Sequence, residues 1–307
     1  MPDQSELDAK HDIDSGGLMS QALSDLLARL DLEQVETDVF IGTSPQGGLV
    51  RVFGGLVVSQ ALVAASRTVL GRSPHSLHSY FLLPGDPAQP IRYEVERLRD
   101  GGSFGARRCV AKQGGRTIFI MTVSFHIAEE GLDYAPDMPV LPAPEELPSL
   151  EALGAALGGA LPEGVQRYLQ RDRPVELRLV DPSRFAPRAA GTPRRTRQKI
   201  WMRAKGELPD DSAVHRAVLA YLSDMTLLDA SLVPHDRSVF DGKMQVASLD
   251  HSIWFHRPFR ADEWMLYDQE AMSTQGARGL CRGSLFSRTG NLIATVMQEG
   301  LIRPKAM

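Results

Sequence analysis

Leu77-His78-Ser79-Tyr80-Phe81 in the first half of the chain recurs in the second half as Asp250-His251-Ser252-Ile253-Trp254. Two further anchors recur in the same order: residues 103–107 return as residues 274–278, and residues 114–116 return as residues 289–291. In each half an apolar, helix-like segment lies upstream of the anchors. Three anchors in one order predict a duplicated fold, in which two similar units form a pseudo-dimer.

The segments around these anchors predict one long helix and several strands in each unit. Residues 55–68 are apolar nearly all round and predict a buried helix, and residues 212–230 predict its counterpart. An amphipathic helix is expected over residues 17–31. Alternating segments predict strands at residues 75–82, 91–99, 105–113, 117–127, 175–180 and 199–203, with Gly-Gly turns between the strands from 91 to 127. The predicted fold class is α+β, with two antiparallel sheets each wrapped around a long central helix.

A proline-rich stretch separates the two units. Residues 134–148 contain five prolines, a density that is typical of a linker. We therefore expect an N-terminal domain over residues 17–130, a linker over residues 131–170 and a C-terminal domain over residues 171–305.

Composition excludes several classes of protein. The chain has 307 residues, 43% of them hydrophobic, and a formal charge of −4 with both signs mixed, so no basic stripe indicates a nucleic-acid partner. Residues 1–15 are polar and acidic, and no unbroken apolar run approaches about 18 residues, so we expect a cytoplasmic protein with no membrane partner. Cys109 and Cys281 are too few and too far apart to predict a metal site, and we expect free thiols.

Asp224 is the most informative single residue. At helical spacing its neighbours Ala220, Tyr221, Leu227 and Leu228 are largely apolar, and no Lys or Arg stands three or four residues away. A carboxylate on such a face is normally paired, protonated or functional, because an isolated buried charge is costly. The alternative is an Asp near a helix end, half solvated and bonded to the backbone.

Six segments carry a family resemblance: residues 51–55, 78–86, 98–104, 220–224, 249–258 and 296–300. In these segments the chain resembles the acyl-CoA thioesterase II family, the double hot-dog thioesterases of bacteria and peroxisomes. The resemblance implies two hot-dog domains and hydrolysis of acyl-CoA to a fatty acid and coenzyme A. It implies no cofactor beyond the coenzyme A that the substrate carries, and hot-dog interfaces lead us to expect a homo-oligomer, a dimer or larger.

The resemblance also implies a catalytic set of an Asp, a hydroxyl residue and a Gln, which match Asp224, Ser248 and Gln298. The family's hydroxyl residue is typically Thr, and Ser248 keeps the hydroxyl while losing the methyl group that stiffens χ1. Gly-Gly is commonly followed by Gln in the family, whereas this chain has Leu56. We expect Asp224 to act as general base and the other two side chains to hold the attacking water. The first unit carries Val123 where the second has Gln298, so one site per chain is expected.

Two other functions remain open from the sequence. A hot-dog hydratase acting on enoyl-CoA would need an Asp and a His at one site, but Asp250 and His251 are adjacent on a strand and point to opposite faces. A non-catalytic acyl-CoA-binding protein is the second alternative. No Gly-x-Ser-x-Gly motif occurs, which disfavours an α/β-hydrolase.

Overall fold

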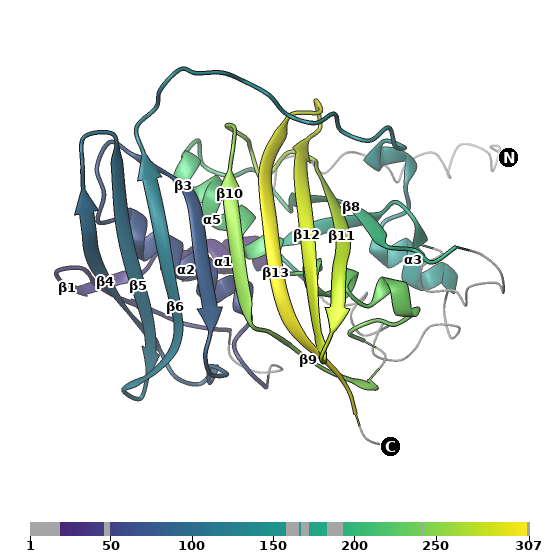
Figure 1. Cartoon of the computed structure of the whole chain (residues 1–307), viewed down its shortest axis with the longest axis horizontal. Helices are drawn as coiled ribbons and strands as arrows, with labels where there is room; N and C mark the ends of the chain where they lie inside the picture. The colour runs from purple at the N-terminus through teal and green to yellow at the C-terminus, as the bar shows by residue number, and fades with distance from the viewer. Residues whose placement is uncertain are drawn as a thin grey trace, which may run out of the picture.

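A computed structural model describes residues 19–45, 50–157, 166, 172–182, 193–240 and 242–305. The described strands form one sheet in the order β1-β2-β4-β5-β6-β3-β10-β13-β12-β11-β8-β7, and β9 also pairs with β13 (Figure 1). Their bounds are β1 Glu33–Glu36, β2 Val39–Gly42, β3 Ser73–Phe81, β4 Ile91–Asp100, β5 Phe104–Gln113, β6 Arg116–His126, β7 Val175–Leu179, β8 Arg197–Ala204, β9 Met244–Ser248, β10 Asp250–Phe255, β11 Met265–Gln275, β12 Arg278–Ser287 and β13 Leu292–Pro304.

The two antiparallel sheets that the sequence predicts are continuous in the structure, because β3 and β10 pair with each other and join the two halves into one sheet. In this antiparallel pairing Ser252 lies opposite His78, and His251 lies opposite Ser79. Outward from this joint, β6, β5, β4, β2 and β1 follow on one side and β13, β12, β11, β8 and β7 on the other. Each half therefore presents its strands in the same order from the joint to the edge.

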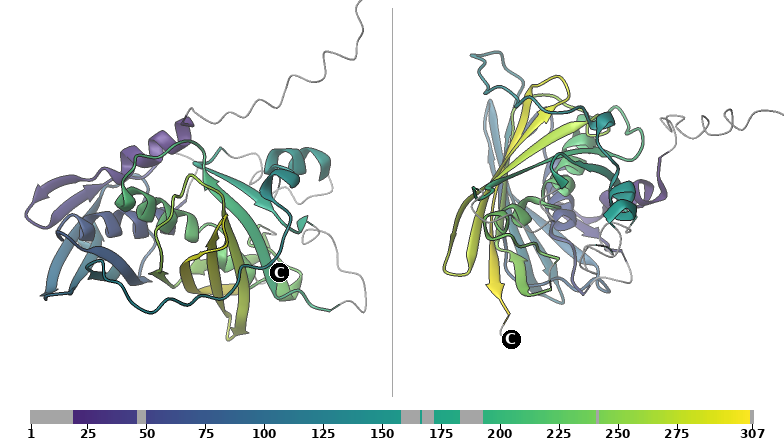
Figure 2. Two further views of the ribbon diagram at one scale, coloured as in Figure 1. Left: turned by 90° about the horizontal axis from the view of Figure 1, so that it is seen from above. Right: turned by 90° about the vertical axis from the view of Figure 1, so that its right-hand side faces the viewer.

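Two long helices, α2 (Gly54–Ser66) and α5 (Ser212–Ser223), lie on one face of the sheet (Figure 2). Ten of the 13 residues of α2 are buried, as its all-round apolar sequence predicts. A Cβ atom added at Gly55 would lie only 2.5 Å from the carbonyl oxygen of Tyr221, so the start of α2 presses against the end of α5. The shorter helix α1 (Gln21–Leu30) begins at Ser20, whose hydroxyl accepts a hydrogen bond from the backbone of Leu23.

The predicted helix over residues 212–230 is interrupted. Helix α5 ends at Ser223, Asp224 is its C-cap, and helix resumes only at α6 (Leu227–Ala230). Side chains from β8 and β11 bind Thr226, which lies in this break. Gln198 donates to the carbonyl oxygen of Thr226 at 3.0 Å, and Gln269 donates to the hydroxyl of Thr226 at 2.5 Å. These bonds to the backbone and side chain at the break compete with continued helix.

One segment, Ser212–His235, is long and apolar enough by length and composition to cross a membrane. Polar residues interrupt its apolar ones, so no unbroken apolar run marks this segment in the sequence. Within the described fold, 78% of its most apolar window is buried, which is the environment of a core helix.

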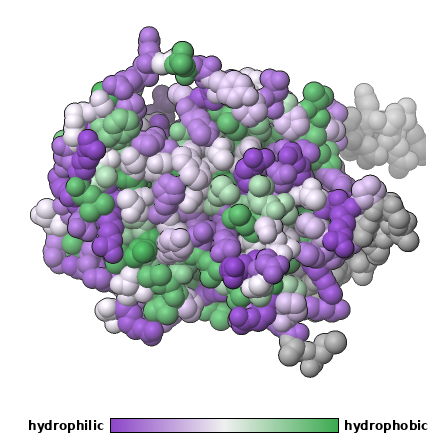
Figure 3. Space-filling view, in the orientation of Figure 1, coloured by the Kyte–Doolittle hydropathy of each residue, from purple (hydrophilic) through white to green (hydrophobic). Residues whose placement is uncertain are grey.

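The proline-rich segment packs on the face of the sheet opposite α2 and α5. Along β8 and β11, Trp201 and Leu266 alternate with inward-facing residues and so point to this face. The linker residues Ala135, Met138, Leu141 and Leu147 cover them, and Trp201 donates a hydrogen bond to the carbonyl of Pro142 at 3.1 Å. This segment continues through a short 3-10 helix (Pro144–Glu146) and α3 (Leu150–Leu157). Elsewhere on this face hydrophilic and hydrophobic side chains are interspersed (Figure 3).

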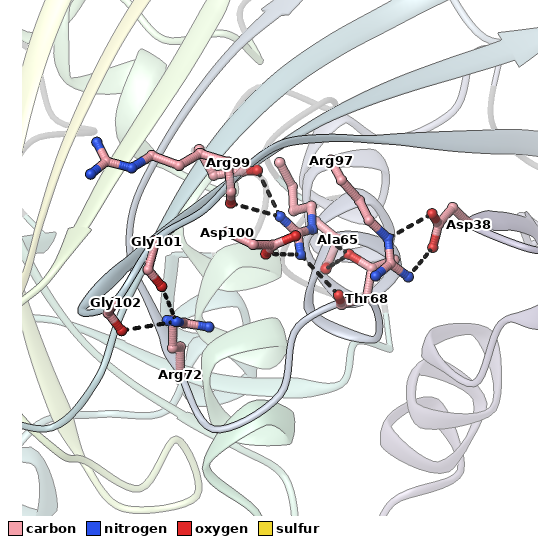
Figure 4. Close-up of polar contacts among 11 residues, drawn as sticks. Asp38, Ala65, Thr68, Arg72, Arg97, Arg99, Asp100, Gly101 and Gly102 are labelled. Carbon is pink, nitrogen blue, oxygen red and sulfur yellow. Dashed lines mark hydrogen bonds and ion pairs between the residues drawn. The ribbon is translucent and has the colours of Figure 1, made fainter.

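Arg107 ties the end of α2 to the sheet through Thr68, Arg99 and Asp100, three residues that lie close together in Figure 4. Its side chain is 1% exposed, and its guanidinium donates to the hydroxyl and carbonyl oxygens of Thr68 at 2.8 and 3.1 Å. The same group donates to the carbonyl oxygens of Arg99 and Ala106 and to the carboxylate of Asp100 at 2.6 Å. A planar group with five donors satisfies all of these acceptors at once.

We predict that Arg107→Met lowers the free energy of unfolding by about 2–3 kcal/mol, because buried carbonyl oxygens lose their donor. The matched control is Arg108→Met on the same strand, whose side chain is 49% exposed and 3.7 Å from Glu96. The control should cost less than about 1 kcal/mol. Urea unfolding measures both, and equal losses would contradict the assignment.

Candidate active site

Asp224 lies in a largely dry environment at the end of α5. Its side chain is 9% exposed, so it is far more buried than the half-solvated Asp of the alternative interpretation. Burial raises the pKa of this carboxyl from 3.8 to about 6, against the opposing effects of hydrogen bonds from Gln298, the backbone of Gly55 and Ser248, and of the charge of Arg51. A carboxyl group that titrates near pH 6 can both accept and return a proton at neutral pH.

Gln298 reaches Asp224 from strand β13. Along β13, residues Ala294, Val296, Gln298 and Gly300 are buried on the helix-covered face. The Nε2 atom of Gln298 donates to Oδ1 of Asp224 at 2.5 Å and to Oγ of Ser248 at 3.0 Å. Its Oε1 atom is buried without a hydrogen-bond partner among the described residues, so it remains available as an acceptor.

Ser248 completes the group from the last position of β9. Strand β9 pairs with β13 so that Ser248 lies opposite Gly300. The Oγ atom of Ser248 donates to Oδ1 of Asp224 at 3.4 Å while it accepts from Gln298. The structure thus brings together all three residues that sequence analysis selected, from one helix end and two strands. Their catalytic role stays a prediction.

The first half of the chain forms the opposite wall of the site, and sequence analysis assigned no role to these residues. Helix α2 begins at Gly54, and the backbone N–H of Gly55 donates to Asp224. A side chain at Gly54 would meet both Asp224 and the ring of Phe81. The signal in the sequence was the Gly-Gly pair directly before an apolar helix, which indicates close backbone approach.

His251 lies close to the site but is not poised for proton transfer. It is fully buried, and its Nε2 atom lies 2.8 Å from the hydroxyl of Ser223. Since that hydroxyl donates to the carbonyl of Ala220, the histidine is the donor. Burial lowers the pKa of His251 to about 3, so it is neutral at physiological pH. Asp250 instead accepts from the backbone of Glu299 at 2.6 Å, and the pair forms no dyad.

Arg278 and Arg282 are two arginines that could meet the phosphates of coenzyme A, and each forms an ion pair with a carboxylate of this chain. Arg278 bonds Glu299 at 3.0 Å, and Arg282 bonds Glu270 at 2.8 Å. The cysteines Cys109 and Cys281 are free and buried, as expected. Burial raises the pKa of the Cys281 thiol to about 12, so neither its position nor its protonation suits nucleophilic catalysis.

Comparison with known proteins identifies the family of this chain. A family model for acyl-CoA thioesterase matches residues 170–301, and a model for the acyl-CoA thioesterase N-terminal domain matches residues 42–126. Acyl-CoA thioesterase 2 of Haemophilus influenzae is 40% identical over 289 residues, which cover 93% of this chain and 99% of that protein. The structure of an acyl-CoA thioesterase II from Mycobacterium marinum is 41% identical, with a TM-score of 0.74 over 92% of this chain and 99% of that one.

A more distant structure defines the fold class. A protein of Alicyclobacillus acidocaldarius described as having a hot-dog fold aligns with a TM-score of 0.73 at 20% identity, over 92% of this chain and 99% of that one. The large antiparallel sheet with its helices is therefore a hot-dog thioesterase fold. At 40% identity over almost the whole chain, the protein belongs to the acyl-CoA thioesterase II family.

The raised pKa of Asp224 predicts a pH-dependent stability cost. The pKa of Asp224 is about 6 in the folded protein and 3.8 for an ordinary exposed Asp. The contribution of this carboxyl to stability is therefore fully present below pH 3.8 and is lost as the pH rises through 6. Over this window the wild type should lose up to about 3 kcal/mol of unfolding free energy relative to Asp224→Asn. Urea unfolding of both proteins at pH 4 and pH 7.5 measures this difference, and an unchanged difference would contradict the burial of an ionisable carboxyl.

Proposed function

We propose that the protein hydrolyses fatty acyl-CoA to a free fatty acid and coenzyme A, with water activated by Asp224. The observation that carries this proposal is the hydrogen-bonded group of a carboxylate, a hydroxyl and an amide in otherwise apolar surroundings. Burying three polar side chains together is costly unless they satisfy one another and are used. Membership of the acyl-CoA thioesterase II family supplies the substrate class.

In the proposed reaction the water oxygen attacks the thioester carbonyl carbon and its proton passes to Asp224. The hydroxyl of Ser248 and the amide of Gln298 orient this water. A backbone N–H in the first turn of α2 is our candidate for stabilising the oxyanion of the tetrahedral intermediate. Cleavage of the C–S bond then releases the coenzyme A sulfur, which takes the proton back from Asp224. The sulfur keeps the electron pair of the broken C–S bond and receives the proton that left the water, so no further reactant is needed.

We propose that the chain is a double hot-dog with a pseudo-two-fold axis through the pairing of β3 and β10. The identical strand order of the two halves supports this, as does the crosswise register of His78 with Ser252 and of Ser79 with His251. In a two-fold pairing, when residue i contacts the equivalent of j, residue j contacts the equivalent of i.

The domain division at residues 17–130, 131–170 and 171–305 belongs to the same proposal. So do a single active site per chain, the absence of a cofactor beyond the substrate's coenzyme A, a homo-oligomeric assembly and a cytoplasmic location. One family model matches residues 42–126, inside the first proposed domain. The other matches residues 170–301, which lie inside the second proposed domain except for the first residue.

The geometry favours hydrolysis over the hydratase alternative. An enoyl-CoA hydratase would need a histidine beside the carboxylate, whereas His251 donates to Ser223 and its pKa is lowered to about 3. Release of free thiol from palmitoyl-CoA, followed with a thiol reagent, distinguishes a hydrolase from a hydratase and from a non-catalytic binding protein.

We predict that Asp224→Asn keeps the fold and loses about 10²–10⁴-fold of kcat, because the amide cannot accept the proton of water. In the wild type, kcat/KM should rise with pH and level off above about 6, the pKa of Asp224. Thiol release across pH 5–8 measures both effects. A folded Asp224→Asn protein with near wild-type turnover would refute the mechanism.

We predict that Ser248→Thr preserves or raises activity, whereas Ser248→Ala lowers it. The hydroxyl holds the water, and the additional methyl group of Thr only restricts the rotamers of that hydroxyl. Equal values of kcat for Ser, Thr and Ala at this position would show that residue 248 does not orient the water.

A further inference from the structure

The two oxygens of Asp224 have different surroundings. Both side-chain hydrogen bonds that the described residues make to this carboxylate go to Oδ1, from Gln298 and Ser248. The Oδ2 atom instead faces the start of α2. A Cβ atom built on Gly54 would lie 2.7 Å from Oδ2 and 3.0 Å from Cε1 and Cζ of Phe81. The carboxylate and the aromatic ring thus both border the small space, called the slot below, that a side chain at residue 54 would fill.

We propose that Gly54 is a positioning residue for the hydrolysis reaction, whose missing side chain keeps Oδ2 of Asp224 open to the reacting water. This inference rests on the proposed function, in which Asp224 takes a proton from that water. The proposed role belongs to the missing side chain of Gly54 and is separate from any role of its backbone N–H. Gly54 acts by leaving the space between Asp224 and Phe81 unfilled.

The backbone has no room to withdraw and admit a side chain. At the next residue, Gly55, an added Cβ atom would lie 2.5 Å from the carbonyl oxygen of Tyr221. The start of α2 is therefore pressed against the end of α5 on one side and against the site on the other. Neither glycine has a positive φ, so the requirement is steric and does not come from an unusual backbone conformation.

A methyl group at residue 54 would have two possible effects on the carboxylate. If Asp224 stays in place, the methyl covers Oδ2 and removes the oxygen from the water. If Asp224 rotates away, it loses its contacts with Gln298 and Ser248. Both effects disfavour the ionised form, the first by further desolvation and the second by loss of hydrogen bonds. Helix propensity favours Ala over Gly at this position, so a loss of activity would not come from a weaker helix.

The test is Gly54→Ala, with Gly102→Ala as matched control. An added Cβ at Gly102 meets nothing within 4 Å and its φ is not positive, so the control reports the general effect of replacing a glycine. We expect Gly54→Ala to lower kcat for palmitoyl-CoA by about 10–100-fold, the order of loss produced by a misplaced catalytic group. The midpoint of its pH–rate profile should move above that of the wild type, and the control should match the wild type.

A second readout is independent of turnover. A ¹³C-NMR titration of the Asp224 carboxyl in the protein without substrate should give a higher midpoint in Gly54→Ala than in the wild type. If wild-type protein releases no thiol but this midpoint rises, the proposed function fails. The steric contact between a side chain at residue 54 and Asp224 is then still supported. If turnover requires Asp224 but Gly54→Ala leaves kcat and both midpoints unchanged, the inference is overturned alone.

Rescue separates a filled slot from general damage, and it also covers the case in which Gly54→Ala does not fold. The double variant Gly54→Ala/Phe81→Leu removes the ring that closes the slot, so the methyl group can shift away from Asp224. We expect kcat of the double variant to exceed that of Gly54→Ala, or the double variant to fold where the single variant does not. A double variant no better than the single one in kcat, midpoint or folding would overturn the role of the slot.

Discussion

The antiparallel pairing of β3 with β10 is the interaction on which the rest of the structure depends. It turns two half-sheets into one, and it sets the start of α2 against the end of α5. The same joint carries the site: the backbone of Phe81 donates to Leu249 at 2.9 Å, and Leu249 donates to Glu299 at 2.9 Å. Phe81, Ser248 and Gln298 therefore lie at neighbouring strand positions, each within one residue of this hydrogen-bonded chain. The second half supplies the three polar side chains of the site, and the first half supplies Gly54, Gly55 and Phe81 beside them.

Neutral groups, rather than a buried counter-charge, keep Asp224 in its intermediate state. The nearby His251 is neutral because its burial lowers the pKa of the ring, and Gln298, Ser248 and the backbone of Gly55 contribute only dipoles. A buried arginine pair would have pulled the pKa of the carboxyl down, and a wholly apolar pocket would have raised it further. These dipoles and the charge of the exposed Arg51 oppose burial only in part, so the pKa of Asp224 is about 6, where the carboxyl can exchange a proton with water near neutral pH.

Much of this arrangement was predictable from the sequence, and the failures have physical causes. The helix at 55–68 follows from its nearly all-round apolar sequence and the strands between 75 and 127 from their alternating pattern, and the structure has them within a few residues of the predicted ends. Strand β1, by contrast, is exposed at every residue, so it carries no alternating pattern to detect. The break after Ser223 depends on Gln198 and Gln269, which are distant in sequence. The role of Gly54 depends on Phe81 and Asp224, and no local pattern reports such a contact.

In each half a buried polar side chain of the sheet binds the end of the long helix, but the side chain is a cation in the first half and a neutral amide in the second. In the sheet, Val123 lies opposite Arg107, and Gln298 lies opposite Cys281. If Val123 and Gln298 are equivalent, the buried polar side chain is on β5 in the first half, as Arg107, and on β13 in the second half, as Gln298. Each binds the end of its own long helix, Arg107 at Thr68 and Gln298 at Asp224. The cation satisfies backbone carbonyls and leaves nothing to react, whereas the neutral amide supports a carboxylate without neutralising it. The first half thus lines one side of the site, and the second half carries Asp224, the group that can exchange a proton.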